Sequence, residues 1–501
     1  MRRIISSASA RQKVDEAGGN LREAARRLGI PKSTLWDALQ KDVGVKRFVV
    51  TYAQNDTPVH QGFYDSVMTY CKENKAELIC YKGYHWNKTS PHTCDKNNPI
   101  WAKDLWPYLL DSKRELNENL VIYPAKTVPT AANPLQGYES VTGHKSGIFP
   151  HPKLDDIPVS TPGHMMAKIL TTTGAITVKN YSDTKTGNKG DFHHIIGAAI
   201  VEVKDNKVFH LRHINADQDG SFYDIAGGKI RLYDGDKVTT TNTIDTMVFG
   251  DLHFPFVHWP SFYGAMDLLE KIKCNRLVIH DVIDFYRENH HTKNDRFLNA
   301  AKEQFGDKSV EEEIRGAANL IMKMSHPERE LLITRSNHDE ALDRWLNESN
   351  PNDLGINSAY YHYLCWRKHK SVKQESYGYS FANPLEIAVG DMINLKEHNI
   401  RFLKRSAPEI HLDIDYSMHG DKGPNGSRGS LNNLSKIGTK STTAHNHGRG
   451  IKGGHYRVGT KSIIPLGYAI GGPGSWTHTD QITYSNGKRT LINWINGECH
   501  L

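Results

Sequence analysis

The stretch Thr246–Pro255 reads T-M-V-F-G-D-L-H-F-P and indicates how the second half of the chain folds. Its apolar residues predict a buried strand, and Asp251 and His253 follow directly after that strand. Because they stand two positions apart, the two side chains project to the same side of an extended chain. The stretch therefore predicts a strand that ends in two potential metal ligands.

Four further predicted strands end in residues of the same kinds. They are Arg276–Phe285, R-L-V-I-H-D-V-I-D-F, with Asp281 and Asp284; Glu330–Glu340, E-L-L-I-T-R-S-N-H-D-E, with Asn337 and His338; Ile410–Gly423, I-H-L-D-I-D-Y-S-M-H-G-D-K-G, with His419; and Ser441–Gly450, S-T-T-A-H-N-H-G-R-G, with His445 and His447. One aspartate at a strand end is often only a helix cap, but five such ends in order form a stronger pattern. Catalytic groups of α/β folds gather at the carboxyl ends of strands. A mixture of carboxylate, imidazole and amide groups suits manganese, iron or zinc.

The order D-x-H, G-D-x-x-D, G-N-H-D, H and G-H-x-H resembles that of the calcineurin-like metallophosphoesterases, a superfamily of two-metal phosphate-ester hydrolases. The resemblance covers residues 243–501. The stretch H-G-D-K-G-P-N-G-S-R-G-S from His419 and the C-terminal S-N-G-K-R-T-L-I look like the phage-encoded branch, which includes host-DNA-degradation nucleases of tailed phages. The resemblance implies an α/β fold, a four-layer metallophosphoesterase sandwich over residues 241–501.

The resemblance also implies a site for two divalent metal ions, Mn²⁺ first, with Fe²⁺ or Zn²⁺ as alternatives. One ion would be held by Asp251, His253 and His447, the other by Asn337, His419 and His445, with Asp281 as the bridge between them. Two metals about 4 Å apart can lower the pKa of a shared water and neutralise phosphoryl oxygens.

The same resemblance assigns catalytic roles to two residues that do not bind metal. His338 would face the phosphate and protonate the leaving oxygen, and Asp284 would orient its imidazole. The sequence departs from the family pattern where His280, Ser336 and Ala444 replace glycines. His280 is the largest change, and it would shift the metal environment or add a further donor.

Four residues bear on the substrate. Protein serine/threonine phosphatases of this superfamily carry an arginine where this chain has Phe285, and repair nucleases of the SbcD type carry a histidine where it has Asp284. Lys422 and Arg428 lie in a glycine-rich loop whose amides can bind phosphate, so we expect them to contact DNA. We expect a DNA phosphodiesterase. The alternatives are a phosphatase or cyclic-nucleotide phosphodiesterase, and a non-catalytic DNA-binding regulator.

The excess positive charge lies in the N-terminal segment. The 501-residue chain has a formal net charge of +7, and residues 1–48 hold eleven Lys or Arg against five Asp or Glu. Within residues 1–44 the periodicity predicts two short helices joined at Gly29, similar to the helix-turn-helix of Fis-type regulators. Lys32, Ser33, Thr34 and Trp36 on the second helix would face the major groove of DNA. The alternative is a helical hairpin that contacts protein.

The regions between these two parts carry no predicted site. Residues 45–124 read as strand, helix, strand and predict a small α/β domain, whereas residues 125–240 are rich in Thr, Val, Ile and Gly and predict a β-rich domain. His193 and His194 precede an apolar strand, so we interpret them as a strand-end pair.

Composition points to a soluble protein. The six scattered cysteines indicate a reducing compartment rather than a disulfide framework. Mean hydropathy is −0.58, and no run approaches the ~18 apolar residues of a membrane span. We expect a cytoplasmic protein without a membrane partner that forms a homo-oligomer, by analogy with related nucleases.

Overall fold

The computed structural model describes residues 21–28, 44–92, 95–163, 165, 167–405 and 407–499. Helix α2 (Leu21–Leu28) lies where the first N-terminal helix is predicted. The predicted DNA contacts Lys32, Ser33, Thr34 and Trp36 lie outside the described residues.

A six-stranded sheet with order β19-β16-β15-β14-β25-β26 forms the centre of the second half of the chain. Its strands are β14 (Thr243–Val248), β15 (Lys273–Ile279), β16 (Glu330–Ile333), β19 (Ile400–Phe402), β25 (Thr479–Thr483) and β26 (Arg489–Asn493). The strands β14, β15, β16 and β19 are parallel to one another, and β25 is antiparallel to β14. The predicted α/β fold is therefore confirmed, and the strands expected from the first three stretches are neighbours.

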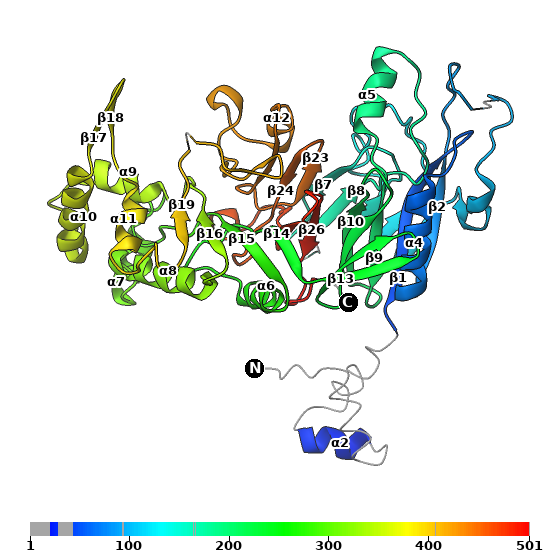
Figure 1. Ribbon diagram of the computed structural model, residues 1–501. Coiled ribbons are helices and arrows are strands. Elements are labelled where there is room, and N and C mark those ends of the chain that lie inside the picture. The colour runs from blue at the N-terminus through cyan, green and yellow to red at the C-terminus, as the bar shows by residue number, and fades with distance from the viewer. Residues whose placement is uncertain are drawn as a thin grey trace.

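Helices cover one face of this sheet and gather at one end of the molecule (Figure 1). They are α6 (Trp259–Lys271), α7 (Arg296–Gln304), α8 (Val310–Met324), α9 (Ala341–Glu348), α10 (Ser358–Lys370) and α11 (Pro384–Gly390). Helix α8 shows why they form: the side chain of Ser309 caps its first turn, and its buried residues include Ile314 and Ile321 on one face. These residues pack with Leu277 of β15 in one core. A hairpin of β17 (Lys373–Glu375) and β18 (Gly378–Ser380) projects beside the helices.

A ten-stranded sheet packs against the opposite face. Its order is β20-β21-β22-β24-β23-β7-β8-β6-β5-β4. The strands are β20 (Ile410–His411), β21 (Ile414–Asp415), β22 (Lys440–Thr443), β24 (His455–Arg457), β23 (Gly450–Lys452), β7 (Asp155–Val159), β8 (Lys168–Thr171), β6 (Ser146–Ile148), β5 (Leu120–Ile122) and β4 (Arg114–Asn117), and α12 (Leu431–Leu434) lies against β23 and β24. Val248, Val278 and Leu332 meet Ile414 and Ala444 between the two sheets. Strands from both sides of residue 240, where the catalytic domain is predicted to begin, share this sheet.

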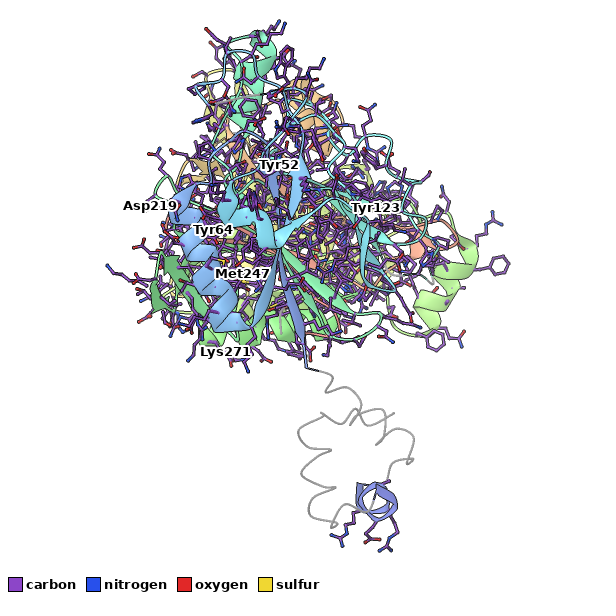
Figure 2. The ribbon with its side chains drawn as sticks, turned by 90° about the vertical axis from the view of Figure 1, so that its right-hand side faces the viewer. Tyr52, Tyr64, Tyr123, Asp219, Met247 and Lys271 are labelled. Carbon is purple, nitrogen blue, oxygen red and sulfur yellow. The ribbon has the colours of Figure 1, made fainter. Side chains whose placement is uncertain are left out.

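A five-stranded sheet, β10-β9-β1-β2-β3, completes the other end of the molecule. It contains β1 (Lys46–Gln54), β2 (Ala76–Gly83), β3 (Leu109–Leu110), β9 (Gly197–Val203) and β10 (Phe209–Asn215). β1 and β2 are parallel and α4 (Gln61–Asn74) joins them, which is the predicted strand, helix, strand order. Figure 2 looks onto this end, with α4 at the left beside the strands.

A small sheet of three strands and one helix complete the middle of the chain. β11 (Phe222–Ala226), β12 (Lys229–Asp234) and β13 (Lys237–Thr241) form a small sheet beside α4, and α5 (Lys185–His193) projects from the top of the molecule in Figure 1. His193 and His194 thus end a helix and precede β9. Within the described residues, no helix is long and apolar enough to span a membrane.

Candidate metal centre

The five predicted strand ends meet where the two large sheets face each other. β14, β15 and β16 are parallel neighbours, so the residues that follow them emerge at one edge of the six-stranded sheet. β21 and β22 are parallel neighbours in the ten-stranded sheet, and the backbone N–H of Ala444, just after β22, donates to the carbonyl of His419. Pairing within each sheet and packing between them therefore bring together side chains that are up to 196 residues apart.

One group of potential ligands is tightly clustered and buried. Asp251, His253, Asp281 and His447 each offer one ligand atom, and these atoms all lie within 4.8 Å of one another. His253 Nε2 lies 2.9 Å from His447 Nε2 and 3.5 Å from Asp281 Oδ2. His447 Nε2 lies 3.3 Å from Asp251 Oδ2. Two imidazole nitrogens and two carboxylates converge on one small volume.

The hydrogen bonding of this group fits a bound cation. Among the described residues, Asp251 Oδ1 and Asp281 Oδ2 have no hydrogen-bond partner although both atoms are buried. A buried carboxylate oxygen without a partner is costly unless a cation or a donor satisfies it. The donor set and its unsatisfied oxygens therefore fit a divalent metal ion.

A second group adjoins the first through Asp281. His419 Nε2 lies 2.9 Å from Asn337 Oδ1 and 3.3 Å from Asp281 Oδ2. The ring of His445 lies 5.1 Å from that of His419, and its backbone N–H donates to Asp251 Oδ2 at 2.9 Å. The seven predicted metal ligands thus lie together, with Asp281 between the two groups.

The electrostatics of the two groups favour positive charge at their centre. Burial and the charge of Asp281 raise the pKa of Asp251 well above its usual range. Burial opposes ionisation of Asp281 too, but His419 and His338 hold the pKa of Asp281 well below its usual range. Burial alone would lower the pKa of His419, yet Asp281 and Asp251 raise it to about 9. The cluster stabilises a cation next to Asp281, as a metal site requires.

The backbone at the strand ends is strained. His253, Asp281, His445 and His447 have φ values of +50°, +41°, +72° and +56°. Residues other than glycine rarely adopt this region, at a cost of roughly 1–3 kcal/mol each. Such strain persists where the surrounding structure holds it and is concentrated at functional sites. Four of the twelve non-glycine residues with positive φ in the described part of the chain are therefore predicted metal ligands.

His280 lies directly behind the second group. Its Nδ1 is 3.4 Å from His419 Nδ1, and its Nε2 is buried with no hydrogen-bond partner in the described part of the chain. Burial, together with His419, lowers the pKa of His280 to about 3, so its ring is neutral. This position places an extra imidazole beside a predicted metal ligand.

His338 and Asp284 stand at the rim of the cluster. The backbone N–H of His338 donates to Asp281 Oδ1 at 3.3 Å. His338 Nδ1 lies 3.2 Å from the Asp284 carbonyl and 3.5 Å from the Asp284 carboxylate, and the His338 side chain is 20% exposed. The same carboxylate lies closer to His253 Nδ1, at 3.1 Å. Asp284 thus contacts both histidines, whereas the sequence predicted only the contact with His338.

The predicted loop contacts lie on the surface. Lys422 and Arg428 are exposed and pair as a backbone bridge across the loop that follows His419. Within the described residues neither has a contact with the metal ligands, and their role in binding DNA stays a prediction.

Two aromatic residues near the centre carry no motif and were not predicted. The ring of Trp476 packs edge-on against that of His447 at 4.3 Å, and Tyr468 lies 5.8 Å from Trp476. Because Tyr468 is 68% exposed, it presents an open face beside the cluster.

A buried ion pair supports the last strand end. Arg449 donates two hydrogen bonds to Asp156 of β7, at 3.0 and 2.9 Å, and neither side chain is exposed. Its backbone N–H donates to Thr477 Oγ1, and the Thr477 N–H donates to the His447 carbonyl. The middle region of the chain thus holds the segment that carries His447.

Comparison with known proteins gives one informative relative. No family model matches the chain. The chain is 30% identical to Protein A1 of Escherichia phage T5 over 492 residues, which covers 94% of this chain and 85% of that protein. The similarity supports a phage origin and extends over the cluster and over the middle region alike.

Proposed function

The chain belongs to the family of Protein A1 of Escherichia phage T5, and we propose that it is a two-metal-dependent phosphodiesterase that hydrolyses DNA. The observation that carries the proposal is the buried group of Asp251, His253, Asp281 and His447, in which two carboxylate oxygens have no hydrogen-bond partner among the described residues. The metallophosphoesterase resemblance of residues 243–501 supports the reaction class, and the phage relative agrees with the likeness to the phage-encoded branch of that superfamily.

In such a reaction, some residues of the chain would bind the metal ions and others would donate a proton. Bound divalent cations would supply an activated water and neutralise charge on the phosphoryl oxygens. Asp251, His253 and His447 would hold one cation, Asn337, His419 and His445 the other, and Asp281 would contact both. His338, at the rim, would donate a proton to the leaving oxygen, and the Asp284 carbonyl 3.2 Å from Nδ1 would leave Nε2 as the nitrogen that faces the substrate.

Tyr468 and Trp476 favour a nucleic acid over a phosphoprotein. An exposed aromatic face beside the phosphate site can stack on the base next to the scissile bond, and each stacked base contributes about 1–3 kcal/mol. A phosphoserine has no planar group at that position. The aromatic pair therefore supports a nucleotide substrate.

The proposal is tested by Mn²⁺-dependent nicking of supercoiled plasmid and by hydrolysis of a small phosphodiester. We expect the wild type to perform both and His338→Ala to lose both, because the leaving oxygen loses its proton donor. Arg315→Met, an exposed substitution on α8, serves as the matched control. Hydrolysis of the small ester with an intact plasmid would refute the DNA substrate, and nicking by His338→Ala at the wild-type rate would refute the mechanism.

A further inference from the structure

A cavity of about 760 Å³ lies at the end of β22 opposite the metal centre. Lys440, the first residue of β22, lines it, whereas His445 follows the other end of that strand. Four strand residues span about 13 Å at 3.3 Å each, so the cavity is separate from the cluster. None of the predicted metal ligands lines it.

The cavity combines cationic groups with an apolar wall. Its lining includes five cationic side chains and, among the described residues, one carboxylate, that of Asp217; the cations are Lys153, Lys179, Lys440, Lys488 and Arg489. Leu154, Val178, Ile196 and Tyr456 contribute apolar surface. A volume of this size is typical of sites for small organic ligands, which are roughly 300–1,000 Å³.

Several of the cations are free to meet a ligand. Lys440 is exposed and has no ion pair within the described residues. Lys488 lies 3.6 Å from Asp217, and Lys179 pairs with Asp191, in both cases with exposed side chains. Exposed ion pairs contribute only about 0–1 kcal/mol, so an anionic ligand can replace these partners. Arg489, by contrast, is held by the carbonyls of Ser441 and Gly454 and supports the wall.

Aromatic groups stand at the opening. Phe192 is 79% exposed, and its ring lies edge-on to His193 at 5.0 Å. Both line the cavity at the end of α5. An exposed phenylalanine beside cationic groups suits a ligand in which a planar group is joined to a negatively charged one.

We infer that this cavity binds a nucleoside phosphate, with the phosphate near Lys440 and Lys488 and the base near Phe192. The ligand is either a free nucleotide or one unit of a nucleic-acid strand, since both present a planar base and a phosphate. The inference does not depend on the proposed nuclease activity, because the cavity shares no residue with the metal centre.

The test locates the ligand and then measures its binding. The full-length wild type is photo-crosslinked with 8-azidoadenosine 5′-monophosphate, with and without Mn²⁺, and the modified peptides are mapped. We expect modification near Phe192 and Tyr456 in both conditions, and competition by deoxyadenosine monophosphate. Modification confined to the peptides of the metal centre would overturn the inference.

Calorimetry of the same protein identifies the groups that bind and the form of the ligand. Deoxyadenosine monophosphate should bind at least tenfold more weakly to the Lys440→Glu/Lys488→Glu variant. Lys440→Gln/Lys488→Gln should show a smaller loss, and the charge-matched control Lys370→Glu/Lys396→Glu should bind as the wild type does. A 5′-phosphorylated oligonucleotide that binds more tightly than the mononucleotide identifies a strand as the ligand, and the reverse identifies a free nucleotide. No saturable binding of either, or equal binding to all variants, overturns the inference.

Discussion

Replacing Arg449 with methionine tests how the middle region supports the metal centre. The substitution keeps an apolar side chain of similar length but removes the guanidinium that holds Asp156. Both side chains are completely buried, and two hydrogen bonds of 3.0 and 2.9 Å join them. Arg449 also donates to Asn493 Oδ1 at 2.9 Å, but that oxygen accepts a hydrogen bond from Thr479 Oγ1 as well, so the group that the substitution leaves without its donor is the Asp156 carboxylate.

The magnitude follows from the burial of Asp156. Breaking a buried ion pair by removing one partner costs about 3–5 kcal/mol, because the remaining charge stays in a medium that does not solvate it. We therefore expect Arg449→Met to lower the free energy of unfolding by about 4 kcal/mol. Replacing both partners, as in Arg449→Met/Asp156→Leu, removes the stranded charge and should recover most of that loss.

Urea denaturation followed by circular dichroism and tryptophan fluorescence measures these differences. Arg315→Met is the control, since Arg315 forms an exposed pair with Glu311 on α8 and its loss should cost no more than about 0.5 kcal/mol. A loss below about 1 kcal/mol for Arg449→Met would mean that the buried pair with Asp156 does not stabilise the fold as expected. So would a double variant no more stable than the single one.

Four further predictions concern the metal centre, the substrate and pH. In Mn²⁺ titration calorimetry, His445→Ala and His447→Ala should each weaken the binding of a different one of the two ions, by about tenfold or more. Loss of affinity for the same ion in both variants would contradict the assignment of ligands. Chelation of the metal should lower the free energy of unfolding by about 2.7 kcal/mol relative to protein with Mn²⁺ at a hundred times its Kd. An unfolding transition that does not change on chelation would exclude the metal site. Tyr468→Ala, but not Tyr468→Phe, should reduce about tenfold the preference in kcat/KM for a thymidine 5′-phosphodiester over a methyl phosphodiester; an unchanged ratio would argue against stacking. Burial lowers the pKa of His210 to about 4, so the folded protein binds fewer protons there than the unfolded chain and loses stability as the pH falls from 6.5 toward 4. His210→Gln should make the free energy of unfolding depend less on pH in that window. If it depends on pH as steeply in the variant as in the wild type, His210 is not the group responsible.

Much of the candidate site could be predicted because its signals are local. An apolar run followed by Asp251 and His253 needs only the alternation of a strand and the order of residues along the chain. The same holds for Asp281, Asn337, His419 and the pair His445 and His447. Each strand end carries its own pattern, and the α/β fold brings such ends to one edge.

The contacts of Asp284 show where local signals stop. Sequence spacing related it to His338, but its carboxylate is closer to His253, at 3.1 Å against 3.5 Å. Which of two histidines a carboxylate approaches depends on the packing of two strand ends against each other. No spacing along the chain encodes that choice.

The kinds of residue at each strand end, the α/β class and the chemistry that those residues suit can all be predicted from the order of residues along the chain. Long-range packing is what places β7 and β22 in one sheet, joins Arg449 to Asp156, 293 residues away, and packs Trp476 on His447. This difference arises because strand formation and residue order follow from local periodicity, whereas partners far apart along the chain are chosen by the burial and hydrogen bonding of the whole molecule.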